Sequence, residues 1–147
     1  MSKKQRPKKK YKPKNVAVPP YLNSLDAYSQ RTDIDPRDGD RTFLLQVANR
    51  TVSEGDLAIN CYSIQAAWAL AEKMENTSEI RKCLSDGFAA VGAYLDVETR
   101  EEKFTPEVFE MLSQAIETTR SIFENSGQVE RAQALNAALR GQVNIRI

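Results

Sequence analysis

Apolar residues recur at a spacing near 3.6 residues along most of the chain after position 40, and this period predicts a series of helices. We expect the first helix over residues 41–52, with Asp40 as its N-cap. The second follows Ser53-Glu54-Gly55-Asp56, a hydroxyl cap with an acid three residues later. Its apolar side chains form two neighbouring rows, which predicts a central helix. The rows contain Leu57, Cys61, Ile64, Trp68 and Ala71, and Ile59, Tyr62, Ala66 and Leu70.

A third helix is predicted after Asn76, whose side chain would cap it while Glu79 closes a capping box. Gly87 and Gly92 lie inside this helix, where each costs about 1 kcal/mol relative to alanine. They either permit close approach of a neighbouring helix or mark a kink, and the sequence leaves both open. The charged residues at 98–103 end the helix. Its apolar rows contain Ile80, Leu84, Phe88, Val91 and Leu95, and Cys83, Ala90, Tyr94 and Val97.

The sequence Thr105-Pro106-Glu107 predicts the start of a fourth helix, because threonine caps, proline fits the first helical position and an acid suits the positive end of the dipole. A fifth helix follows Asn125-Ser126-Gly127-Gln128 and ends at Gly141. Residues 142–147 alternate polar and apolar positions, which fits a short strand or a docked tail. The core positions of the two helices are Val108, Leu112, Ala115, Ile116, Ile122 and Phe123, and Val129, Ala132, Leu135 and Leu139.

Five helices with connections of a few residues predict an all-α fold, a compact bundle in a domain over residues 41–147. Residues 15–40 lack this periodicity, and we expect an extended strap lying on the body, followed by acidic turns over residues 33–40. A calcium-binding EF-hand loop starting at Asp33 would need glycine at its sixth position and glutamate at its twelfth. The chain has Asp38 and Leu44 there, so a calcium site is not predicted.

Charge divides the chain into two parts. It has 21 Lys+Arg and 20 Asp+Glu, a net charge of +1, but residues 1–14 carry eight positive charges and no acid. The remainder has 13 positive and 20 acidic residues, a net of −7. Repulsion between like charges and two prolines predict a disordered basic tail over residues 1–14. Its side chains suit DNA or RNA phosphates and one base-stacking ring. The candidate nucleic-acid-binding residues are Lys3, Lys4, Arg6, Lys8, Lys9, Lys10, Tyr11, Lys12 and Lys14.

This tail has other interpretations: an arm for an acidic protein surface, or a solubilising terminus without a specific role. Base-specific contacts are not predicted, since no helix has a basic face suited to the major groove. A further hypothesis is that the acidic segment 33–40 competes for the tail and keeps it from nucleic acid until a partner arrives.

Few residues suit catalysis or metal binding. The chain has no histidine, which removes the commonest general base and the usual activator of serine or cysteine nucleophiles. Cys61 and Cys83 do not have the spacing of metal ligands, and on apolar helix faces they are expected to be structural thiols. Trp68, Phe88 and Phe123 are assigned to the core rather than to a ligand pocket. We therefore expect neither an enzyme nor a metal or other cofactor.

No apolar run is long enough for a membrane helix or a signal peptide, so we expect a cytoplasmic protein with no membrane partner. The order of Lys9-Lys10-Tyr11-Lys12-Pro13-Lys14, then Thr51-Val52-Ser53-Glu54-Gly55-Asp56-Leu57, then Phe104-Thr105-Pro106-Glu107 resembles a group of short proteins encoded by phages and other mobile elements of proteobacteria. The resemblance implies an accessory role in the cytoplasm of a bacterial host, and it implies no activity and no site residues.

The sequence thus favours a non-enzymatic accessory or regulatory protein whose tail makes sequence-independent contacts to nucleic acid. The alternative is a protein–protein interaction or inhibitor module that acts through the acidic helical body, with the tail as an auxiliary arm. Helical faces this apolar also allow a homodimer.

Overall fold

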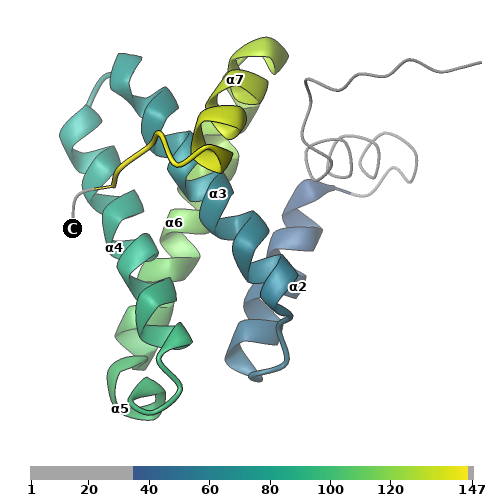
Figure 1. Ribbon diagram of the computed structural model, residues 1–147, viewed down its shortest axis with the longest axis vertical. Helices are drawn as coiled ribbons and strands as arrows, with labels where there is room; N and C mark the ends of the chain where they lie inside the picture. The colour runs from purple at the N-terminus through teal and green to yellow at the C-terminus, as the bar shows by residue number, and fades with distance from the viewer. Residues whose placement is uncertain (1–34, 146–147) are drawn as a thin grey trace, which may run out of the picture.

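The computed structural model describes residues 35–145, and this part of the chain is all-α (Figure 1). It forms a compact helical bundle, as the hydrophobic period predicted, and no strand occurs within it. The elements are α2 (Pro36–Ala48), α3 (Glu54–Leu70), the 3₁₀ helix η2 (Ala71–Lys73), α4 (Thr77–Leu95), α5 (Arg100–Lys103), α6 (Pro106–Glu124) and α7 (Gln128–Leu139).

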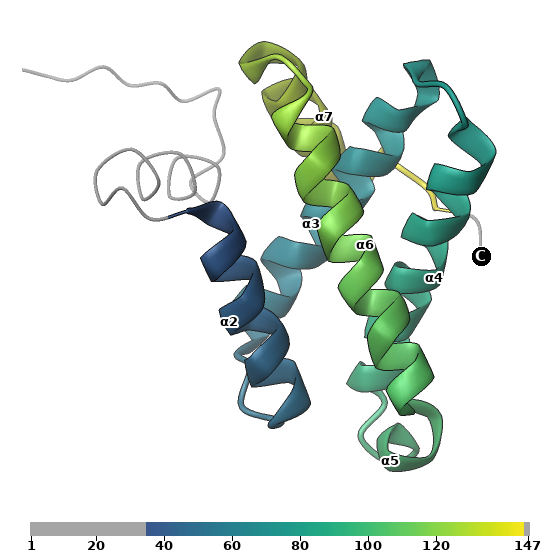
Figure 2. The ribbon, with the colours of Figure 1, turned by 180° about the vertical axis from the view of Figure 1, so that it is seen from behind.

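The bundle is organised around α3, which packs against α7, α4 and α6. This confirms the central position predicted from its two apolar rows. The most extensive packing is between α4 and α6, while α2 packs on α6 on the side away from α4 (Figure 2). The largest side chains that are fully buried come from five different helices. They are Ile64, Leu84, Leu112, Leu135 and Val47.

Two of the predicted helix starts are confirmed. Ser53 Oγ accepts a hydrogen bond from the Asp56 N–H at 3.1 Å at the start of α3. Thr105 Oγ1 accepts one from the Val108 N–H at 3.3 Å, and Pro106 occupies the first turn of α6. Each hydroxyl satisfies a backbone donor that has no partner within its own helix.

The predicted start of the first helix is wrong. Helix α2 begins at Pro36, so residues 36–40 are helical rather than turns, and Asp40 is not the cap. Asp35 is the cap, and its Oδ1 accepts a hydrogen bond from the Arg37 N–H at 3.0 Å. An aspartate cap followed by proline at the first position favours a helix strongly enough to include Gly39. The helix also ends at Ala48, four residues before the predicted end.

The capping box predicted at Asn76 is also wrong. Asn76 does occupy the cap position of α4, but its backbone is left-handed (φ 59°, ψ 33°) and its side chain makes no capping hydrogen bond. The Thr77 hydroxyl instead donates to the carbonyl oxygens of Ala71, at 3.0 Å, and of Met74. The turn is therefore fixed by the residue after the cap.

The ends of the predicted apolar rows are not all buried. Leu95 and Val97 are 53% and 72% exposed, because α4 ends at Leu95 and the separate short helix α5 follows. Val129, predicted for the core face of α7, is 69% exposed. That face is shifted toward Ala134 and Ala138, which are buried.

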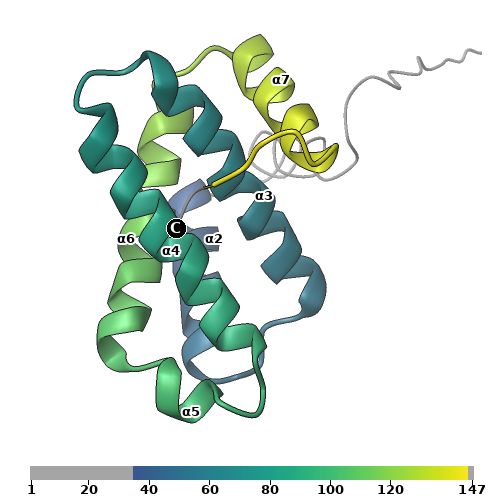
Figure 3. The same ribbon diagram turned by 60° about the vertical axis from the view of Figure 1, so that its left-hand side comes forward.

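The C-terminal segment distinguishes between the two predicted states. Gly141 adopts φ +71°, a left-handed conformation that ends the helix as predicted. The chain then crosses α3 toward α4, with Val143 buried and Ile145 packed against the core (Figure 3). Residues 142–145 thus form a docked tail and not a strand. Residues 146–147, the end of the predicted segment, lie outside the described part of the chain.

Candidate functional site

The residues predicted to bind nucleic acid, including Tyr11, all precede residue 35. They therefore lie outside the described residues. The same holds for residues 15–34 of the predicted strap.

The described body is acidic. Residues 35–145 contain 18 Asp+Glu and 11 Lys+Arg, a difference of −7. Five of the 11 cations form ion pairs with carboxylates, and three more donate hydrogen bonds to backbone carbonyl oxygens. The first group is Arg37, Arg41, Arg50, Lys82 and Arg120. The second group is Arg81, Arg100 and Arg131.

Only Lys73, Lys103 and Arg140 remain without a partner among residues 35–145. They lie on three different elements: η2, α5 and the C-cap of α7. The described surface thus lacks a cluster of free cations of the kind that holds a phosphate backbone.

A cleft with a volume of about 740 Å³ lies between α2, α3, α6 and α7. Apolar side chains from all four helices line it. They are Phe43, Ile59, Ile116, Phe123 and Leu135. Five carboxylates and two arginines also line it, so its charged side chains are mostly acidic. These residues are Asp35, Asp38, Asp40, Asp56, Glu124, Arg120 and Arg131.

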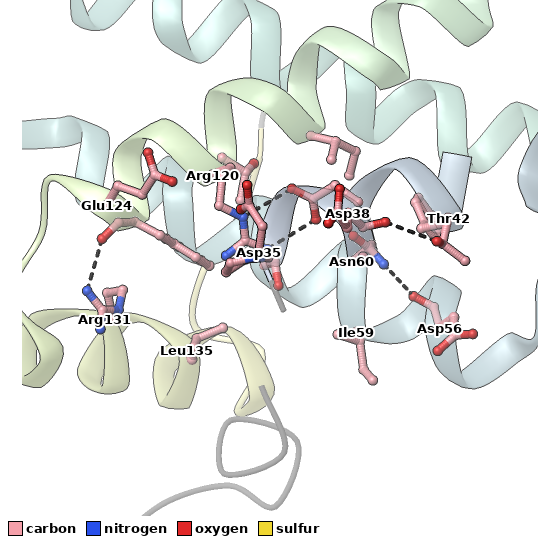
Figure 4. A pocket seen from close by; sticks show the side chains of 18 of the residues that line it. Asp35, Asp38, Thr42, Asp56, Ile59, Asn60, Arg120, Glu124, Arg131 and Leu135 are labelled. Atoms are coloured by element: carbon pink, nitrogen blue, oxygen red, sulfur yellow. Dashed lines mark hydrogen bonds and ion pairs between the residues drawn. The ribbon is translucent and has the colours of Figure 1, made fainter. Parts of the chain in front are cut away.

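The cleft is shown from close by in Figure 4. Arg131 and Leu135 of α7 lie on one side, and Asp38 and Thr42 of α2 lie on the other, next to Ile59 of α3. A volume of this size is within the range of about 300–1,000 Å³ that is typical of ligand sites. An acidic and apolar lining suits a peptide segment better than an anion such as a phosphate.

Helix α2 is fixed to the body by two arginine–carboxylate pairs that border the cleft. Arg120 of α6 donates from Nε and Nη2 to Asp40 at 3.0 and 3.1 Å, and both side chains are about four-fifths buried. Arg37 donates to both carboxylate oxygens of Glu124 at 2.5 and 2.9 Å, which raises the pKa of its guanidinium. Asp40 is therefore the α2 side of an inter-helix pair, a role the sequence did not indicate.

Thr119 of α6 lines the cleft and is only 5% exposed, yet its Oγ1 has no hydrogen-bond partner among residues 35–145. A buried hydroxyl left without a partner costs about 1–3 kcal/mol. Because the Oγ1 atom itself is buried, this cost belongs to the packing of α6.

A second polar cluster joins the α2–α3 loop to α5. Arg50, in a left-handed conformation (φ 62°), donates to both carboxylate oxygens of Glu101 at 3.0 and 3.1 Å. The Arg50 guanidinium lowers the pKa of Glu101. The central carbon of the Arg50 guanidinium also lies 5.5 Å from the centre of the Phe104 ring. The same carbon of Arg100 lies 4.1 Å from the centre of the Tyr94 ring. This cluster holds the α2–α3 loop against α5 and is a structural contact.

The aromatic residues considered for a pocket are separated. Phe123 lines the cleft, whereas Trp68 packs under the Arg81 guanidinium, whose carbon lies 4.6 Å from the ring centre. Phe88 is partly buried against the core. Trp68 and Phe88 therefore pack against the core, as predicted. Phe123 is also buried in the core, but it borders the cleft as well.

Both cysteines are free and partly buried. Burial raises the pKa of the Cys61 thiol to about 11, so it is protonated at neutral pH. The Cys83 Sγ lies 3.4 Å from Thr118 Oγ1. The Cys61 environment is that of an inert structural thiol.

Within residues 35–145, histidine, cysteine and acidic side chains do not gather into a group that could hold a metal ion. In the same part of the chain, every helix is too short or too polar to cross a membrane. Comparisons with protein-family models, curated proteins and solved structures found no match.

Proposed function

We propose that this protein is a non-enzymatic accessory or regulatory protein of a phage or mobile element, and that it holds nucleic acid through residues 1–14. The cationic side chains of this tail contact phosphates, and Tyr11 stacks on a base. The contacts are sequence-independent and the setting is the cytoplasm of a bacterial host.

The observation that supports this proposal most is the separation of charge. The described body has a net charge of −7, and eight of its 11 cations are engaged by carboxylates or carbonyl oxygens. Such a body repels a phosphate backbone, since nucleic-acid affinity depends on cations that displace counterions. The tail holds eight cations within 14 residues, so it is the favoured contact.

The test compares the full chain with a variant whose tail is neutral, using short single-stranded and duplex DNA and RNA. The variant carries Lys3→Gln, Lys4→Gln, Arg6→Gln, Lys8→Gln, Lys9→Gln, Lys10→Gln, Lys12→Gln and Lys14→Gln. We expect the full chain to bind all four probes at low salt and the neutral variant to lose most of this affinity. Equal affinity of the two proteins would refute the proposal.

A second candidate is a protein-binding or inhibitor module that uses the acidic body. The cleft favours it, because its apolar and acidic lining suits a peptide segment. Capture of host proteins from a nuclease-treated lysate by the neutral-tail variant tests this candidate. Capture must be lost on Ile59→Asn in the cleft and kept on Val129→Asn, an exposed position on α7.

A further inference from the structure

We propose that the cleft between α2, α3, α6 and α7 is the docking site for residues 15–34 of the same chain. This inference goes beyond the proposed function, because it concerns the fold of the chain and requires no nucleic acid.

The chain itself attaches this segment to the cleft. The described chain begins at Asp35, which lines the cleft and caps the helix that forms one of its walls. Residues 15–34 are therefore joined to the body at the edge of the cleft. Twenty residues span up to about 66 Å when extended, whereas the 13 residues of α2 are only about 20 Å long. The segment is thus long enough to follow the whole cleft.

The segment also matches the cleft in its chemistry. The segment combines apolar side chains with Pro19-Pro20, which oppose a helix and keep other backbone groups available for hydrogen bonds. The cleft offers apolar side chains from four helices. The apolar residues of the segment are Val16, Val18, Tyr21, Leu22, Leu25 and Tyr28.

Tethering favours this segment over other occupants. A segment tethered at the site has an effective concentration near the millimolar range. A separate peptide, or the same segment of a second copy, must compete with it at a much lower concentration. The occupant with the shortest connection to the cleft is therefore favoured.

The test measures proximity by NMR in the full chain with Cys61→Ala and Cys83→Ala. A nitroxide is attached at Asp38→Cys, an exposed position on the cleft, or at Glu79→Cys, an exposed control position on α4. Docking predicts that the Asp38 label broadens the amide signals of residues 16–28 several-fold more than the Glu79 label does. Equal broadening, or broadening that only declines with sequence distance from residue 38, would overturn the proposal.

Two variants establish that the cleft causes this effect. Ile59→Asn changes a cleft residue, and Val129→Asn makes the same kind of change at an exposed position outside it. We expect broadening from the Asp38 label to fall several-fold with Ile59→Asn and to persist with Val129→Asn. If Ile59→Asn disturbs the body, the triple variant Tyr21→Ser, Leu22→Ser and Leu25→Ser must give the same loss. Persistence in that variant contradicts the proposal.

A mixing experiment separates the chain's own segment from that of a second copy. Isotope-enriched chain without a label is mixed with spin-labelled chain that is not enriched. Docking within one chain predicts no broadening of residues 16–28 in the mixture. Broadening there would assign the cleft to a second copy and reject the proposal.

Discussion

Gly87 of α4 and Ala115 of α6 meet where these two 19-residue helices pack together. A Cβ atom added at Gly87 would lie 2.1 Å from the Cβ of Ala115. Gly87 therefore permits the close approach of α4 and α6, one of the two roles that the sequence left open.

Gly87→Ala is expected to destabilise the protein by about 1–3 kcal/mol, the usual cost of overpacking a core. The matched control is Gly92→Ala on the same helix, where an added Cβ meets nothing within 4 Å. That change is expected to stabilise by about 0.4–1 kcal/mol, because alanine loses less backbone entropy on folding. Urea unfolding of both variants checks this, and a Gly87→Ala variant as stable as the parent would contradict the packing.

Asp40→Asn removes the carboxylate charge that α2 contributes to the inter-helix pair with Arg120. Because this pair is mostly buried and makes two hydrogen bonds, we expect a loss of about 1.5–3 kcal/mol. Asp38→Asn breaks an exposed pair with Arg41 within α2 and is expected to cost less than about 1 kcal/mol. Chemical denaturation monitored by circular dichroism compares the two, and equal losses would show that Asp40 does not anchor α2.

The Arg50–Glu101 pair predicts a specific dependence of stability on pH. Because the pKa of Glu101 is lowered in the folded state, the pair stabilises the protein above the ordinary glutamate pKa of about 4.3. This stabilisation is lost as pH falls through the lower, folded-state pKa. Glu101→Gln should therefore slightly lower Tm at pH 7, and the difference should vanish at low pH. Glu102→Gln, at an exposed neighbour, serves as the control, and a Tm difference that persists at low pH would argue against the pair.

Cys61 is expected to react slowly with thiol reagents in the native protein. With a thiol pKa of about 11, roughly one molecule in a thousand carries the reactive thiolate at pH 8. A Cys83→Ala variant isolates this thiol for a colorimetric assay. We expect the reaction to accelerate strongly in guanidinium chloride, and rapid native labelling would show that Cys61 is accessible.

Local sequence signals predicted most of the fold. Ser53 and the Thr105-Pro106 pair marked helix starts correctly, because a cap depends only on residues within one turn. The same logic applied to Asp35-Pro36 would have found the start of α2, but the nearby acids and Gly39 favoured a prediction of turns. Asn76 is a residue type that favours a helix cap, but its left-handed backbone keeps its side chain from making the capping hydrogen bond.

The cleft was beyond such signals. Asp40 and Arg120 are 80 residues apart, and Arg37 and Glu124 are 87 residues apart, so no spacing rule connects them. The buried hydroxyl of Thr119 is likewise a property of helix packing, since its neighbours in sequence do not distinguish it from an exposed threonine.

We infer that the tail, and not the body, holds nucleic acid, and the salt dependence of duplex DNA binding separates the two. Two variants lose the same charge: Lys8→Gln, Lys9→Gln and Lys10→Gln in the tail, and Lys73→Gln, Lys103→Gln and Arg140→Gln at the three unpartnered body cations. Plots of log K against log salt concentration are expected to have a negative slope, with a magnitude of up to about 7 for the parent and a magnitude about 2–3 smaller for the tail variant. The body variant should keep the parent slope. A slope reduced only in the body variant, or equally in both, would contradict the claim.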